Sequence, residues 1–69
     1  MELDTSILSD LKKHKMPYGK YSGLFIYEIP TFYLEWYFKK GFPKGRLGML
    51  LATMYEIKIN GLESILNDI

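Results

Sequence analysis

The sequence predicts a small α+β domain that is mostly helical, with one short β-hairpin between an N-terminal helix and two further helices. Apolar residues recur at helical spacing near the N-terminus and again over two later segments. Between these segments, residues 15–29 combine aromatic and β-branched runs with a turn bounded by glycines, a pattern typical of a hairpin. The chain has 69 residues, so we expect a single small domain, 1–69.

Composition limits the chemistry that is available to the chain. It has no cysteine and a single histidine, so a disulfide is excluded and neither a metal site nor another cofactor is expected. The net charge is +1, and any attraction for nucleic acid must therefore come from local clusters of cations. The sequence has no apolar run of about 18 residues and no signal-peptide pattern. We therefore expect a cytoplasmic protein without a membrane partner.

The apolar load is heavy for so short a chain. Hydrophobic residues make up 48% of the sequence and aromatic residues 16%. A domain of this size buries only about 60% of the surface that its unfolded chain exposes. Some apolar surface should therefore meet a partner, and a homodimer is the simplest such assembly.

Residues 4–13 are predicted to form a short amphipathic helix that Asp4 or Thr5 caps. Its apolar face would consist of Leu3, Ile7, Leu8 and Leu11. In the following hairpin, Pro17 restricts its strand to an edge because proline cannot donate to a ladder. Gly19 and Gly23 are expected to adopt backbone conformations that other residues rarely take.

A second helix is predicted from Thr31, as its N-cap, to about Lys40, ending at Gly41 in a left-handed conformation. At 100° per residue, Trp36 lies on the border between the apolar and polar sides. The core side would hold Tyr33, Leu34, Tyr37 and Phe38, and the polar side Glu35, Lys39 and Lys40.

A third helix is predicted from about Lys44 to Ile59, and Asn60-Gly61 would end it. Because it is apolar on nearly all sides, it should be either central or at an oligomer interface. Residues 62–66 would then cover the core as a last helical turn or two.

Two clusters of cations and rings are candidate binding sites. In the hairpin turn, Lys20 would contact phosphate while Tyr18 and Tyr21 stack on bases. The alternative is that the tyrosines pack and Lys20 is merely solvated. Near the second helix, Trp36 would stack a base beside Lys39 and Lys40, or would serve only in packing.

Lys44 and Arg46 lie at the predicted start of the third helix, where free N–H groups favour an anion. This segment is not a P-loop, because it lacks the preceding strand and the Gly-Lys-Ser/Thr ending. The alternative is that both charges point into water. If an anion does bind, Lys20, Lys40, Lys44 and Arg46 should converge on one face with Trp36 at the rim.

No pattern of acids, serines or histidine forms a complete catalytic constellation, so we expect a protein that is not an enzyme. The first hypothesis is a non-enzymatic binding module for nucleic acid or a nucleotide-like anion. The alternative is a homo-oligomeric protein-interaction module with a regulatory or virulence-associated role and no nucleic-acid binding. A third possibility is an oligomer that sequesters a small nucleotide.

Over residues 10–66 the sequence resembles the small bacterial family labelled "putative quorum-sensing-regulated virulence factor". The residues that carry the resemblance are Met16-Pro17-Tyr18-Gly19-Lys20-Tyr21-Ser22-Gly23, Ile29-Pro30, Tyr33-Leu34 with Trp36, Lys40-Gly41-Phe42-Pro43, Leu47-Gly48 with Leu50-Leu51, and Glu56-Ile57-Lys58 with Asn60-Gly61-Leu62. The first motif is also similar to the C-terminal appendage of exodeoxyribonuclease-X-like proteins. That similarity implies a DNA-related accessory role, although the catalytic carboxylates of such nucleases are absent here and Ser22 replaces an expected lysine.

Overall fold

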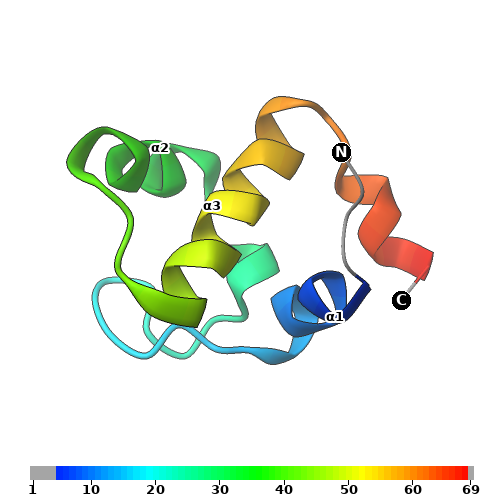
Figure 1. Ribbon diagram of the computed structural model, residues 1–69, viewed down its shortest axis with the longest axis horizontal. Helices are drawn as coiled ribbons and strands as arrows, with labels where there is room; N and C mark the ends of the chain where they lie inside the picture. Colours follow the sequence, from blue (N-terminus) through cyan, green and yellow to red (C-terminus); the bar gives the residue numbers. More distant parts are fainter. Residues whose placement is uncertain (1–4, 69) are drawn as a thin grey trace.

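The computed structural model describes residues 5–68, and over these residues the protein is helical. Its elements are α1 (Thr5–Lys13), the 3-10 helix η1 (Ile26–Glu28), α2 (Thr31–Lys40), α3 (Gly45–Ile59) and the 3-10 helix η2 (Glu63–Asp68). Figure 1 shows α3 in the middle of the molecule, with α1 and α2 on its two sides. In the described part of the chain, no helix is both long and apolar enough to cross a membrane.

The predicted α+β class is wrong, because residues 5–68 contain no β-strand. The chain does double back after α1, but its pairing is limited to one antiparallel bridge between Lys15 and Phe25. The Met16 N–H donates to the carbonyl of Leu24 at 2.7 Å, and the Ile26 N–H donates to that of His14 at 3.0 Å. The Gly23 N–H also donates to the carbonyl of Met16 at 2.8 Å, so the predicted hairpin is a loop closed by three backbone hydrogen bonds.

The bridge cannot grow into a ladder in either direction. Immediately beyond it, Pro17 has no N–H to donate, and the chain enters the loop. On the other side the backbone coils into η1, where the Ile29 N–H bonds to the carbonyl of Ile26 at 3.2 Å. Glu28 also accepts the Phe25 N–H through its side chain at 3.1 Å. These local bonds satisfy backbone groups that a second strand would otherwise have paired.

The helix predicted at the N-terminus is confirmed as α1, which buries Leu8 and Leu11. Ile7 packs partly buried against the same core. Asp4 and Leu3, to which a cap and a place on the apolar face were assigned, lie outside the described residues.

The predicted second helix is confirmed as α2, but two details of its prediction are wrong. Thr31 is not the N-cap: it is already helical, Pro30 takes the cap position, and no side chain caps the helix. Phe38 is 57% exposed rather than on the core side, although one side of its ring stacks on Tyr55 of α3 with 5.0 Å between ring centroids. The border position predicted for Trp36 is confirmed, since it is 50% exposed. The positive φ expected at Gly41 is also confirmed.

The third predicted helix is confirmed as α3, and its central place explains its wide apolar surface. It contacts α1, α2 and η1, and it buries Leu50, Leu51, Met54 and Ile57. Its end at Asn60-Gly61 is a Schellman motif. The Leu62 N–H donates to the carbonyl of Ile57 at 2.9 Å, and the Gly61 N–H to that of Lys58 at 3.2 Å. This turn leads the chain into η2, which returns Leu66 to the core.

Candidate functional site

The loop after α1 folds against α2 and creates an open cavity of about 310 Å³. The cavity is lined by Lys20 from the loop and by Phe32, Tyr33 and Trp36 from α2. We call these four residues the aromatic surface. Phe32 is 64% exposed and Trp36 is 50% exposed, so both rings are available to a ligand.

Contacts between rings hold this surface in place. Trp36 stacks on Tyr33, with 6.1 Å between ring centroids and planes 18° apart. Tyr21 from the loop meets Tyr33 edge-on at 4.8 Å and Phe32 at 6.4 Å. The Lys20 ammonium lies 5.7 Å from the Tyr21 centroid, which fits a cation–π contact. Tyr21 thus fixes the cation relative to the exposed rings.

Tyr33 of this surface and Tyr18 of the loop both interact with Tyr37 of α2. The pKa of Tyr37 is raised from 10.0 to about 12, and burial is the largest cause. Hydrogen bonds and charge interactions with Tyr33 and Tyr18 contribute the rest of this rise. Tyr18 is 48% exposed, so part of its ring remains at the surface. The Tyr18 hydroxyl interacts with that of Tyr37, which connects the loop to α2.

The raised pKa predicts that stability falls in alkaline solution. Below pH 10 the folded and unfolded chains both keep the Tyr37 proton, so this group leaves the free energy of unfolding unchanged. Between about pH 10 and 12 the unfolded chain releases the proton while the folded protein keeps it, and the free energy of unfolding decreases. Urea unfolding at a series of pH values should show a shallower decrease for Tyr37→Phe than for wild type. Equal slopes for the two proteins would contradict the assignment.

The remaining predicted cations have different surroundings. Lys39 pairs with Glu35 one turn earlier on α2 at 3.4 Å. Arg46 donates from Nε at 3.2 Å and from Nη2 at 2.5 Å to one carboxylate oxygen of Asp10, which ties α3 to α1. The exposed side chains of Lys40 and Lys44 make no hydrogen bond or ion pair with the described residues. The structure therefore brings Lys20 and Trp36 together, whereas the convergence of the wider set of cations stays a prediction.

The sequence analysis did not predict several residues and contacts that the structure shows at or near the site. Phe32 was not among the candidate residues, yet its spacing of four residues from Trp36 was a signal that both rings share one side of α2. The Arg46–Asp10 pair joins residues 36 positions apart, for which no local signal exists. Lys58 donates from Nζ to the carbonyl of Ile29, 29 positions away in the sequence, at 2.6 Å. It thereby fixes the entry to α2 against α3.

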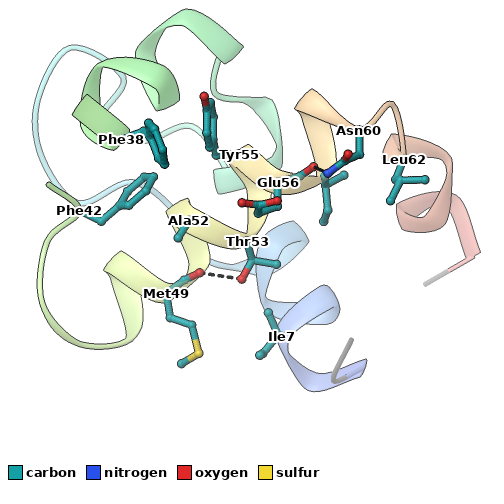
Figure 2. Close-up of a pocket in the computed structure, with 11 residues that line it drawn as sticks. Ile7, Phe38, Phe42, Met49, Ala52, Thr53, Tyr55, Glu56, Asn60 and Leu62 are labelled. Carbon is teal, nitrogen blue, oxygen red and sulfur yellow. Dashed lines mark hydrogen bonds between the residues drawn. The ribbon is translucent and has the colours of Figure 1, made fainter. Parts of the chain in front are cut away.

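A second, larger cavity of about 460 Å³ lies along the outer side of α3, and we call it the α3 groove (Figure 2). Ile7 of α1 borders it on one side, and Phe38 and Phe42 border it on the other. Neither cavity holds a metal-binding cluster, since no group of three or more His, Asp or Glu residues gathers anywhere in residues 5–68. The chemistry available at both sites is stacking, apolar contact and single charges.

Comparison with known proteins places the chain in a family. "Uncharacterized protein YpeB" of Escherichia coli K12 is 41% identical over 51 residues, which are 72% of this chain and 71% of that protein. The protein of the same name from Escherichia coli O157:H7 matches equally well. No solved structure shows a significant match. A family model described as "Putative quorum-sensing-regulated virulence factor" matches residues 4–69. The resemblance seen in the sequence is therefore confirmed, and the chain belongs to this family.

Proposed function

We propose that the protein is a non-enzymatic binding module for a ligand that carries both a base and a phosphate: single-stranded nucleic acid or a nucleotide. One observation carries the proposal: Lys20 lines the same cavity as the exposed rings of Phe32 and Trp36. Exposed aromatic rings stack unpaired bases at about 1–3 kcal/mol per base, and a neighbouring lysine contacts the phosphate. The similarity of the loop motif to a nuclease appendage supports the same ligand class.

Few cations near the aromatic surface are available to contact the phosphates of a ligand. Lys39 already has a carboxylate partner, and so does Arg46. Lys20 is therefore the principal phosphate contact, with Lys40 near the end of α2 as a second cation. Each contact with a single strand contributes about 0.7 to the slope of log affinity against log salt. We accordingly expect a slope between about 0.7 and 1.4.

Lys20→Ala is expected to weaken binding and to lower this salt slope by about 0.7, because one phosphate contact is lost. Trp36 is the only tryptophan, so quenching of its fluorescence reports stacking directly. The titrations would use a short oligothymidylate and, separately, a mononucleotide. Tighter binding of the oligonucleotide identifies a single strand as the ligand, and equal binding per site identifies a nucleotide.

Lys13→Ala is the matched control. It removes the same charge from an exposed position on α1, which does not line this cavity and which lies on the other side of α3 from α2 (Figure 1). It should leave the quenching and the salt slope as they are in wild type. The proposal fails if wild type shows no salt-dependent quenching with either ligand, or if the two alanine variants behave alike.

A specific observation favours the second candidate function, a homo-oligomeric protein-interaction module. The α3 groove is larger than the cavity of the aromatic surface, and its lining is mostly apolar. Apolar hollows of this kind on small proteins commonly mark sites where another chain packs. Both functions are compatible with one molecule, and both suit the cytoplasm as the expected compartment.

A further inference from the structure

One face of α3 is left without a covering helix. Its members Met49, Ala52, Thr53, Glu56 and Asn60 follow the spacing that brings residues to one side of a helix, and all of them line the α3 groove. Met49 and Asn60 are 11 positions apart, which corresponds to roughly 16 Å or three helical turns. The groove is therefore long enough for one more helix to pack against α3, between α1 and the end of α2.

Two polar side chains in the lining of the groove donate hydrogen bonds to backbone carbonyls of α3. The hydroxyl of Thr53 donates to the carbonyl of Met49 at 2.8 Å, as the dashed line in Figure 2 marks. The side-chain amide of Asn60 likewise donates to the carbonyl of Glu56 at 2.8 Å. Because the Met49 carbonyl already satisfies the Thr53 hydroxyl, an apolar partner can cover Thr53. Asn60 keeps one amide N–H and its side-chain oxygen for a polar contact or water at the end of the groove.

Charge is confined to two positions on this side of α3. Glu56 is the charged residue in the described lining, and no cation within residues 5–68 pairs with its carboxylate. Arg46 lies ten residues earlier, about 60° from Met49 around the helix axis. Its side chain is 43% exposed, and only its Nε and one Nη are engaged by Asp10. The remaining N–H groups of the guanidinium are free to meet a second carboxylate.

We propose that a second copy of the chain covers the α3 groove. The two α3 helices would pack antiparallel about a two-fold axis at the level of residue 51. Arg46 would then face Glu56 of the partner subunit, and Met49 would face Thr53 of the partner subunit. Ala52, close to the axis, permits close approach of the two helices. This inference is independent of the proposed nucleic-acid binding.

Charge complementarity selects a second copy, and selects the antiparallel arrangement. A face with a cation at one end, an anion at the other and apolar residues between them is complementary to itself after a two-fold rotation. A parallel pair would instead place each arginine beside the other arginine and each glutamate beside the other glutamate. Antiparallel helices also oppose their macrodipoles favourably.

The first test is Glu56→Arg, which would set arginine against Arg46 of the partner subunit. Sedimentation equilibrium at micromolar concentration should give a dimer for wild type and a dissociation constant at least about tenfold higher for the variant. Ala52→Arg, which adds bulk near the axis, should weaken the dimer as well. The control is Glu35→Arg, the same charge change on α2, which should leave the dimer intact. Circular dichroism checks that each variant keeps its helices.

The second test uses the absence of cysteine from the chain to read the helix direction. Positions 49 and 53 lie at equal distances from residue 51, so the antiparallel arrangement brings each opposite the other. A mixture of Met49→Cys and Thr53→Cys chains should form mixed disulfides faster than either variant alone. A wild type that stays monomeric, a dimer indifferent to Glu56→Arg and Ala52→Arg, or disulfides without preference for the mixed pair would each overturn the proposal.

Discussion

Gly48→Ala is expected to lower the free energy of unfolding by roughly 3 kcal/mol, at the upper end of overpacking substitutions. Gly48 is buried in α3, and a Cβ built there would lie 1.6 Å from the carbonyl oxygen of Pro43 and 2.7 Å from its carbonyl carbon. Both atoms belong to backbone, so no side-chain rotation relieves the overlap. The short connection 41–44 would have to move away from α3 as a whole.

The sign of this effect is informative because helix propensity predicts the opposite. Alanine is favoured over glycine inside a helix by about 1 kcal/mol. Ala52→Gly, in the same helix, measures that difference and should be mildly destabilising. Urea unfolding followed by circular dichroism would compare the two variants. A Gly48→Ala protein as stable as wild type would show that the connection between α2 and α3 does not approach α3 this closely.

Gly19→Ala is expected to destabilise the protein by about 2 kcal/mol, and Gly23→Ala by about 1 kcal/mol. The positive φ angles predicted for both are confirmed, at 84° and 92°. A Cβ at Gly23 meets no atom within 4 Å, so only backbone strain acts there. A Cβ at Gly19 would also lie 2.8 Å from the hydroxyl of Tyr33, and that ring would have to shift.

The two glycine variants also show whether a loss of stability is accompanied by a change in the aromatic surface. Tyr33 stacks on Trp36, so Gly19→Ala should change the tryptophan emission of the folded protein. Gly23→Ala is the matched control and should leave that emission as in wild type. Thermal unfolding gives the order of stability. If Gly23→Ala were the more destabilising of the two, the contact between the loop and Tyr33 would not be the cause.

The sequence predicted two residues of the aromatic surface but not that they lie together. Lys20 and Trp36 were both candidates, because glycines around a lysine and a border tryptophan are local signals. That they line one cavity depends on how the loop folds back onto α2, which the edge-on contacts of Tyr21 determine. Arg46 was a candidate because it lies at the start of the third helix, yet it pairs with Asp10 from a different helix.

The sequence by itself determined the three main helices, the stop at Asn60-Gly61 and the positive φ angles of Gly19 and Gly23. These features depend on interactions within a few residues, such as hydrophobic periodicity, capping and backbone sterics. The tertiary structure alone decided that residues 26–28 coil into η1 rather than continue a strand beyond the bridge at Phe25. It also decided which apolar residues stay exposed, because α2 and α3 each have more apolar surface than their neighbours can cover. The exposed rings of α2 and the α3 groove are that uncovered surface.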